Sequence, residues 1–280
     1  MKRFQKILVT GHRGYIGSRL FSKLKLLGHH VDGIDLKDGD DVLHTLPNNV
    51  KYDTVFHMCA MPKVEYSVKN PSYTLMHNVL GTSRILEWAS KTGVSRVVFS
   101  SSSAIYGDGS GPNSPYGLHK LMSEQECRLF CKLHKMDTVC LRYFNVYSED
   151  QPYGGAYSTI VSAWREMIKT GNPLRVDGDG QQTRDFIHVD DVVSANIFCM
   201  NFNKNFNGAC YDVGTGNSIS VNDIKKIVEK YHTVEWETRP ERKGDVKHTC
   251  ADIEELGKIG WKAEIKINQG IEKAFRKENR

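Results

Sequence analysis

Short apolar runs rich in β-branched residues recur along the first three quarters of the chain, and each run ends in a turn residue or a polar residue. Such runs are typical of buried strands. Between them, apolar residues recur at intervals of three and four, which indicates helices. The predicted strands are KILVTG, HVDGID, DTVFHMCA, RVVFSSSS, TVCLRYFN and ACYDVG, and the predicted helices cover about 15–28, 75–92, 117–135, 157–170, 190–202, 220–231 and 268–277.

The alternation of strands and helices predicts a parallel sheet, because parallel neighbours need long crossover connections and helices supply them. The fold class is therefore α/β: a Rossmann-like, doubly wound parallel sheet. After about residue 145 the alternation loosens into loops that carry Gly, Pro and Asn. We expect a cofactor-binding domain in residues 1–145, with returning segments near 185–215, and a smaller C-terminal α/β lobe for the substrate, mainly in residues 146–280.

The composition is that of an ordinary soluble protein, with 39% hydrophobic and 25% charged residues. A net charge of +5 is too small to indicate nucleic-acid binding, but it suits a small anionic ligand. The seven cysteines form no C-x-x-C pair and the histidines lack metal-ligand spacing, so we expect neither disulfides nor a metal site. The opening apolar run is too short for a signal peptide or a membrane span, which favours a cytoplasmic protein without a membrane partner.

Three glycines, Gly11, Gly14 and Gly17, directly follow the first predicted strand and open the first predicted helix. In dinucleotide-binding folds such glycines allow a tight turn, a close approach of the backbone to a pyrophosphate, and packing of the helix on the strand. The N–H groups at the helix N-terminus then face the phosphates. Glycine turns are common, but this strand–turn–helix context favours a cofactor site.

The second predicted strand ends at Asp35, whose carboxylate can accept hydrogen bonds from a ribose diol and would repel the extra phosphate of NADP. NAD is therefore favoured, although the nearby cations Arg13 and Lys37 leave NADP open. The alternative for Asp35 is that it only starts a turn and binds no cofactor. The stretch from Asp35 to Asp53 is short for a helix, a strand and a second helix, so we expect the sheet to be trimmed there.

Tyr116 and Lys120 lie one helical turn apart and so share a face of the predicted helix. A free phenol has a pKa of about 10 and is a poor base at neutral pH, but a neighbouring ammonium favours its ionised form. Ser102 lies at the carboxyl end of a predicted strand, the edge where open α/β sheets bind ligands, and can hydrogen-bond the same substrate oxygen. Most Tyr/Lys pairs of this spacing are structural; the glycine motif and the serine cluster favour catalysis here.

The motifs TGHRGYIG, FSSSSAIYGD, SPYGLHK, LRYFNVY and TRDFIHVDDV together resemble the extended short-chain dehydrogenase/reductase family, and in particular its nucleotide-sugar epimerases and dehydratases. The resemblance covers nearly the whole chain. It implies that Ser102, Tyr116 and Lys120 are catalytic, that NAD is the cofactor and that the smaller lobe binds a nucleotide sugar. Within the family the resemblance is strongest to UDP-glucose and UDP-N-acetylglucosamine 4-epimerases.

The resemblance also implies further cofactor contacts. Asn78 of NVLGT corresponds to the asparagine that supports the active site in the family, and the loop FHMCAM to the segment under the cofactor. The implied cofactor residues beyond the three glycines, Asp35, Tyr116 and Lys120 are Tyr15, Ile16, Cys59, Ala60 and Asn78, with Asp41 and Val42 as candidates for the adenine contact.

Dehydratases of the family carry an Asp-Glu pair directly after the catalytic serine or threonine, and the decarboxylases keep a Glu. In this chain those positions are Ser103 and Ala104, which cannot serve as acids. The resemblance therefore implies epimerisation at carbon 4 through a transient 4-keto sugar. Two alternatives stay open: a reductase that consumes NAD(P)H to reduce a keto sugar with the same three residues, and a non-catalytic dinucleotide-sensing module, against which intact Tyr116 and Lys120 argue.

The same correspondence with the family motifs implies the substrate contacts. Asn145, Arg184 and Arg242 correspond to family residues that contact the diphosphate, and Asp245 to an acid near the nucleotide ribose. Ser102, Ser103 and Tyr116 are expected to contact the sugar. Thr249 occupies a position that can act as a gate beside the substituent on sugar carbon 2, and because threonine is small, an N-acetyl group should fit.

Relatives pair two helices of this fold across a two-fold axis. The helices predicted near 75–92 and 117–135 carry apolar residues in their outer turns, among them Leu121, Leu129 and Leu133. We therefore expect a homodimer, unless those leucines face only their own sheet.

Overall fold

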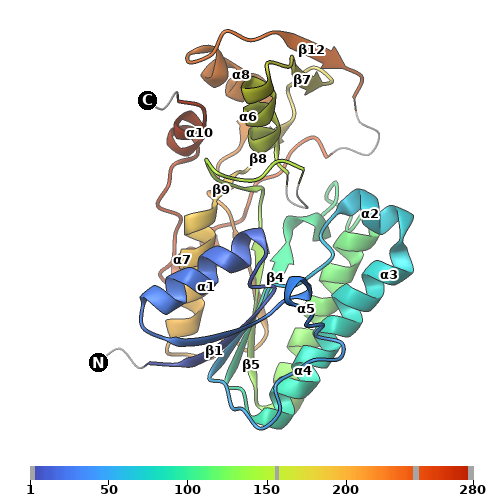
Figure 1. Ribbon diagram of the computed structural model, residues 1–280, viewed down its shortest axis with the longest axis vertical. Helices are drawn as coiled ribbons and strands as arrows, with labels where there is room; N and C mark the ends of the chain where they lie inside the picture. The colour runs from blue at the N-terminus through green and yellow to red at the C-terminus, as the bar shows by residue number, and fades with distance from the viewer. Residues whose placement is uncertain (1–3, 155–157, 242–245, 277–280) are drawn as a thin grey trace. The chain divides into compact units, whose positions relative to one another are not determined.

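The computed structural model describes residues 4–154, 158–241 and 246–276 (Figure 1). The chain forms two compact units. The first contains residues 1–142 and 192–211, and the second contains residues 143–191 and 212–280.

A six-stranded sheet forms the centre of the first unit, in the spatial order β10-β5-β4-β3-β1-β2. β1 pairs in parallel with β2 on one side and with β3 on the other, and β3 pairs in parallel with β4. The strand order therefore reverses between β1 and β3, and the carboxyl ends of these two strands mark the topological switch point where such sheets bind ligands. The strands are β1 (Lys6–Thr10), β2 (His30–Ile34), β3 (Thr54–His57), β4 (Arg96–Ser102), β5 (Asp137–Tyr143) and β10 (Ala209–Val213).

Helices cover both faces of this sheet. Figure 1 shows α1 (Tyr15–Leu26) and α7 (Val189–Asn201) on one face, and α4 (Gly81–Thr92) and α5 (Pro115–His134) on the other. The predicted α/β class with a doubly wound parallel sheet is confirmed. The sheet is also trimmed as expected: in residues 36–53 the only regular element is η1, a single 3-10 turn at Leu36–Asp38.

Local sequence explains where α5 begins, and a second predicted helix begins earlier than expected. α5 begins with Ser114, whose hydroxyl accepts a hydrogen bond from the Gly117 N–H, followed by Pro115 at the first helical position. The helix predicted near 75–92 begins earlier, as α2 (Val64–Lys69) and α3 (Pro71–Leu75) lead into a π-helical turn, η2 (Met76–Leu80), before α4.

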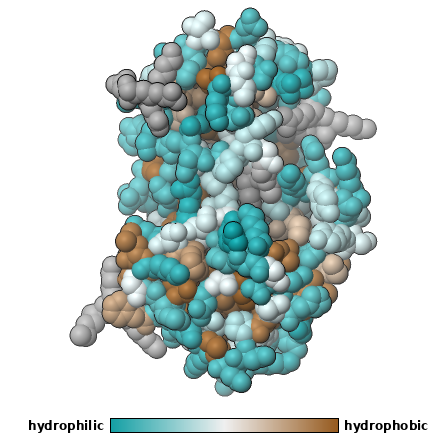
Figure 2. Space-filling model, in the orientation of Figure 1, coloured by the Kyte–Doolittle hydropathy of each residue, from teal (hydrophilic) through white to brown (hydrophobic). Residues whose placement is uncertain are grey.

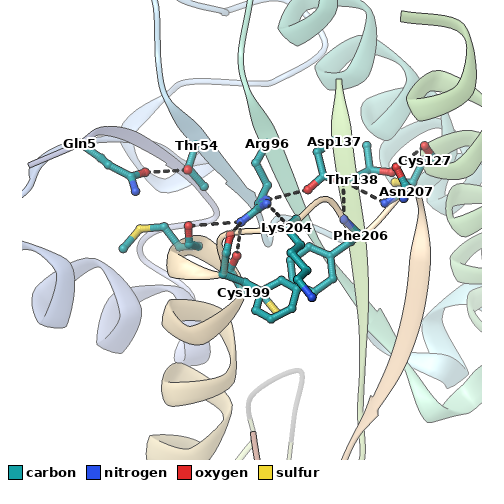
Figure 3. Close-up of polar contacts among 12 residues, drawn as sticks. Gln5, Thr54, Arg96, Cys127, Asp137, Thr138, Cys199, Lys204, Phe206 and Asn207 are labelled. Carbon is teal, nitrogen blue, oxygen red and sulfur yellow. Dashed lines mark hydrogen bonds and ion pairs between the residues drawn. The ribbon is translucent and has the colours of Figure 1, made fainter. Parts of the chain in front are cut away.

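The returning segment is fastened to the sheet by a buried ion pair (Figure 3). Arg96, at the start of β4, donates from Nε to Asp137 at 2.7 Å and from its terminal nitrogens to the carbonyls of Cys199 at 2.6 Å and Lys204 at 2.8 Å. Asp137 accepts the Phe206 N–H at 2.8 Å with its other oxygen. One guanidinium therefore satisfies carbonyls at the end of α7, where a helix leaves them without partners.

The second unit has its own core, built around Tyr147, Trp164, Phe186 and Phe275. Its strands form three two-stranded pairs: β6 with β9, β7 with β12, and β8 with β11. Its elements are β6 (Val146–Tyr147), α6 (Ile160–Thr170), β7 (Leu174–Asp177), β8 (Thr183–Arg184), β9 (Ile187–His188), β11 (Ile219–Ser220), α8 (Val221–Glu229), β12 (Trp236–Arg239), α9 (Glu254–Lys258) and α10 (Ile267–Phe275).

Polar residues predominate on the face drawn in Figure 2, where apolar residues form scattered spots. Among the described residues, no helix is both long enough and apolar enough to cross a membrane.

Candidate active site

The glycine loop after β1 lies at the switch point. Gly11 has φ +74°, and a Cβ there would lie 2.7 Å from the backbone nitrogen of Cys59; a Cβ on Gly17 would collide with the Gly11 carbonyl. Gly14 is the N-cap of α1, and no side chain caps this helix. The N–H groups of the first turn of α1 therefore have no side-chain cap, an arrangement that can accept a phosphate group.

Asp35 closes the other side of this loop. Its two carboxylate oxygens accept the Arg13 N–H at 2.9 Å and the Lys37 N–H at 3.0 Å. The nearby cations are engaged by the chain: Arg13 forms an ion pair with Asp38, and the Lys37 ammonium donates to the Arg13 carbonyl at 3.0 Å. Asp35 itself is half-buried at the end of β2. The Asp35 carboxylate therefore lies where a ribose diol can bind. The side chains of Arg13 and Lys37 already have partners within the chain.

The loop after β3 packs against the glycine loop through buried polar contacts. His57 lies between the hydroxyls of Thr10 at 2.9 Å and Thr82 at 3.0 Å. Burial, reinforced by the Lys120 charge, lowers the pKa of His57 to about 3, so the ring is neutral at physiological pH. Burial raises the pKa of the Cys59 thiol to about 11, and the charges of Lys120, Asp35 and Asp41 all act on this thiol.

Asn78 fixes the same loop from the π-helical turn. Its side-chain oxygen accepts the Met61 N–H at 2.7 Å, and its side-chain nitrogen donates to the Met61 carbonyl at 3.1 Å. The Asn78 carbonyl accepts the hydroxyls of Thr82 at 2.7 Å and Ser123 at 3.2 Å. A π-turn inside a helix is frequently found at functional sites.

Other predicted cofactor contacts have more ordinary surroundings. Tyr15 and Ala60 are half-buried, and Ile16 and Val42 are buried. Asp41 starts a turn by accepting the Leu43 N–H at 3.0 Å. Their contacts with a dinucleotide stay predictions.

Ser102 is the last residue of β4 and the N-cap of η3 (Ser103–Ile105), a 3-10 turn. Its hydroxyl accepts the Ala104 N–H at 3.2 Å, and both Ser102 and Ser103 are half-buried. The hydroxyl thus lies at the carboxyl edge of the sheet, where its hydrogen can be donated to a ligand.

Tyr116 and Lys120 lie on the face of α5 that packs against β4 and η3. Both are almost fully buried, at 5% and 3% exposure. The Lys120 ammonium donates to the Ser100 carbonyl at 2.6 Å and lies 6.0 Å from the centre of the Tyr116 ring. Burial lowers the pKa of Lys120 to about 8, against the opposing effect of neighbouring thiols and Glu124, so the ammonium form still predominates at pH 7. Its charge is therefore available to favour ionisation of the nearby phenol.

Two residues that position Tyr116 were not predicted from the sequence. Ser67, buried in α2, accepts the Tyr116 N–H at 3.1 Å and so satisfies a group that the first turn of α5 leaves open. Gly117 lets α5 approach η3 closely, because a Cβ there would collide with the Ala104 carbonyl. The glycine of SPYG was a visible signal for this close approach; Ser67 offered none.

Three of the predicted substrate contacts, Asn145, Arg184 and Thr249, are described in the second unit, where they lie at or beside residues 183–185. Asn145 donates to the Asp185 carbonyl at 2.8 Å, and Arg184 donates to the carbonyls of Thr183 at 2.9 Å and Lys247 at 3.2 Å. The backbone of Thr249 pairs with the same segment, and its hydroxyl oxygen is buried with no partner among the described residues.

Asp185 connects this segment to two other parts of the second unit, and it was not predicted from the sequence as a site residue. Its carboxylate accepts the N–H groups of Thr215 at 2.9 Å, Gly216 at 2.9 Å and Ala251 at 3.2 Å. Burial raises its pKa against these hydrogen bonds. Arg242 and Asp245, the remaining predicted contacts, lie outside the described residues. Within the described ranges, no three His, Cys, Asp or Glu side chains gather where they could hold a metal ion.

Known proteins match this arrangement over most of the chain. The family model described as "NAD dependent epimerase/dehydratase family" matches residues 7–214. A UDP-glucose 4-epimerase of Mycolicibacterium smegmatis is 30% identical over 306 residues, covering 96% of this chain and 96% of that protein.

Two solved structures share the fold. The first is a UDP-N-acetylglucosamine 4-epimerase from Methanobrevibacter ruminantium M1, in complex with UDP-N-acetylmuramic acid. It has a TM-score of 0.86 at 28% identity, covering 98% of this chain and 97% of that one. The second is a UDP-glucuronic acid 4-epimerase from Bacillus cereus, in complex with UDP-glucuronic acid and NAD. It has a TM-score of 0.85 at 28% identity, covering 96% of this chain and 98% of that one. This chain therefore belongs to the NAD-dependent epimerase/dehydratase family.

Proposed function

We propose that the protein is an NAD-dependent 4-epimerase of UDP-activated hexoses. The observation that carries the proposal is the buried Lys120 ammonium beside Tyr116, on the helix face that packs against the strand end of Ser102. Family membership and the 4-epimerases among its relatives support the reaction class.

The residues at the switch point fit NAD. The glycine loop from Gly11 to Gly14 and the N-terminus of α1, which no side chain caps, would hold the pyrophosphate. Asp35 would bind the adenosine ribose. When bound, NAD supplies a hydride acceptor that also returns the hydride, so the reaction needs no second substrate.

In the proposed mechanism, Tyr116 as phenolate takes the proton from the hydroxyl on sugar carbon 4 as that carbon is oxidised. Ser102 donates a hydrogen bond to the same oxygen, and Lys120 stabilises the phenolate. After the 4-keto sugar has rotated to present its other face, Tyr116 returns the proton to the oxygen. Ser103 and Ala104 supply no acid to eliminate water, which favours epimerisation over dehydration.

The sugar must rotate while its diphosphate remains bound. The residues proposed to bind the diphosphate are Asn145, Arg184 and Arg242. A guanidinium suits this task because it forms paired hydrogen bonds with phosphate oxygens. The small size of Thr249 supports a gate that admits an N-acetyl group at carbon 2.

The assembly proposed is a homodimer in the cytoplasm. On α5 the side chains of Leu118, Met122, Leu129 and Leu133 are 47%, 38%, 52% and 62% exposed. They recur at intervals of four, seven and four, which places them on one face of the helix. Leu121 is half-buried. An exposed apolar stripe of this kind fits a second copy of the chain.

The test is to incubate the purified protein, without added reductant, with UDP-glucose, UDP-N-acetylglucosamine and UDP-glucuronic acid, and to follow C4 epimers by proton NMR. We expect turnover of at least one of them, reduced about a hundredfold or more in Tyr116→Phe. In a parallel incubation with added NADH and a UDP-4-keto sugar, one-for-one consumption of NADH would instead identify a reductase. Turnover of UDP-glucose without any of UDP-N-acetylglucosamine would refute the Thr249 gate.

A further inference from the structure

The face of α5 that carries the catalytic pair continues to a third ionisable residue. Tyr116, Lys120 and Glu124 are spaced four residues apart and so lie one above the other on the helix. Glu124 is only 1% exposed. The mechanism proposed above gives this buried carboxylate no task.

Lys120 and Glu124 hold consecutive residues of β4. The Lys120 ammonium donates to the Ser100 carbonyl at 2.6 Å, and Glu124 accepts the Ser101 hydroxyl at 2.6 Å. Ser102 is the next residue along the strand. The helix that carries Tyr116 therefore fixes the register of the two residues that directly precede the catalytic serine.

Arg142 extends this hold to the residues after Ser102. Its guanidinium donates to both carboxylate oxygens of Glu124, from Nε at 2.9 Å and from Nη2 at 2.8 Å. Its remaining terminal nitrogen donates to the Tyr106 hydroxyl at 2.6 Å, and the guanidinium lies 5.3 Å from the Tyr106 ring centre. Because η3 lies between Ser102 and Tyr106, both ends of the catalytic turn are tied to one carboxylate.

A buried ion pair is a poor way to gain stability, since apolar residues of similar volume stabilise a core as well or better. The side chains of Glu124 and Arg142 are 1% and 20% exposed, so the desolvation of their charges is substantial. An apolar pair would not provide the directional hydrogen bonds to Ser101 and Tyr106. The geometry thus indicates that orientation is what the pair contributes.

We propose that Glu124 is a positioning residue: through Ser101 and through Arg142 it sets the place of the Ser102 turn relative to Tyr116 and Lys120. The inference rests on the proposed function, in which Ser102 and Tyr116 act on one substrate oxygen. Small misplacements of such groups are costly to the rate, because proton transfer and hydrogen bonding need close alignment.

The decisive variant is the double substitution Glu124→Met with Arg142→Met, which removes both charges together and leaves neither unpaired. We expect a melting temperature close to that of the wild type, with kcat lowered roughly ten- to a hundredfold and KM for the UDP-sugar little changed. Wild-type kcat in this folded double variant would overturn the proposal.

A matched control lies on the same helix. Glu126 is also a partly buried acid that accepts a serine hydroxyl, from Ser83 of α4 at 2.6 Å, but it belongs to the face that packs on α4. Glu126→Gln should leave kcat unchanged. If the double variant fails to fold, Ser101→Ala decides, because it removes only the hold on the strand and should still lower kcat severalfold; an unchanged kcat in Ser101→Ala would then overturn the proposal.

Hydrogen exchange separates this inference from the proposed function. In the double variant, amides of residues 102–107 should exchange faster than in the wild type, while amides in the strand interior keep their protection. If the wild type epimerises no UDP-sugar, the proposed function fails on its own, and exchange still reports on positioning. Unchanged protection of residues 102–107 would contradict the positioning role whatever the activity.

Discussion

At the scale of single residues, Gly117 is a position near the proposed catalytic site where a side chain would not fit. Alanine is favoured over glycine inside a helix by about 1 kcal/mol, but a Cβ at Gly117 would collide with the Ala104 carbonyl and lie 3.3 Å from Pro112. We expect Gly117→Ala to lower kcat about tenfold or more and to lower the free energy of unfolding by about 1–3 kcal/mol. Urea denaturation and steady-state kinetics measure both.

Gly257 provides the control for that substitution. It lies in α9, and a Cβ there would meet nothing within 4 Å. Gly257→Ala should therefore follow helix propensity alone, raise stability by about 0.5–1 kcal/mol and leave kcat unchanged. Equal behaviour of the two alanine variants would show that close approach at Gly117 has no importance.

Lys120 should set the alkaline limit of activity. Its pKa is lowered by burial to about 8, so the ammonium proposed to stabilise the Tyr116 phenolate is lost as the pH rises through that value. We expect kcat/KM to decline above about pH 8. The free energy of unfolding changes in the opposite direction. Between about pH 8 and the ordinary lysine pKa, this lysine is protonated in the unfolded chain but not in the native protein. Its contribution to the free energy of unfolding therefore increases as the pH rises.

Activity lost at pH 9 should therefore accompany an unchanged circular dichroism spectrum. In Lys120→Arg, which keeps its charge, the residual activity should decline only at higher pH. An identical alkaline limb in that variant would contradict the assignment to Lys120.

The placement of residues in local motifs could be predicted from the sequence, and contacts between residues distant in the chain could not. Gly11, Tyr116 and Lys120 belong to motifs read within a few positions. Ser67 meets Tyr116 across 49 residues of chain, so no local pattern reveals that bond. Glu124 is intermediate, because its spacing of four from Lys120 was visible but its partners on β4 and β5 were not.

At the scale of elements, the alternation of strands and helices was enough to predict the doubly wound sheet, since connection rules leave few arrangements open. The short stretch after Asp35 also gave the trimmed sheet correctly. The π-turn at Met76–Leu80 could not be predicted, because it differs from an α-helix only in the partner of each N–H group.

The Arg96–Asp137 ion pair should govern the attachment of the returning segment. These side chains are 12% and 5% exposed. Asp137→Ala leaves Arg96 buried without its carboxylate, and we expect it to lower the free energy of unfolding by about 3–5 kcal/mol, measured by urea denaturation. Glu87→Ala, which breaks the exposed pair of Glu87 with Lys91, should leave the urea midpoint unchanged. Equal effects of the two variants would rule out a special role for the buried pair.

At the scale of the whole molecule, the exposed stripe on α5 should determine the oligomeric state. Light scattering should give twice the 31.7 kDa of the chain for the wild type. Leu129→Glu with Leu133→Glu should give the monomer mass, because buried like charges oppose association. Leu26→Glu, at a leucine that is 80% exposed on α1, should remain a dimer. A monomeric wild type would remove the basis of the proposed assembly.

The route by which the first unit is completed has a consequence for synthesis of the protein. Its last strand, β10, ends at Val213, and the segment held by Arg96 lies within residues 192–211. Both leave the ribosome after residues 143–191 of the second unit. Until then β5 presents an open edge, onto which strands of other nascent chains can pair. Chains released before β10 is made should accumulate as insoluble material, and maturation should depend on holding chaperones until the final strand arrives.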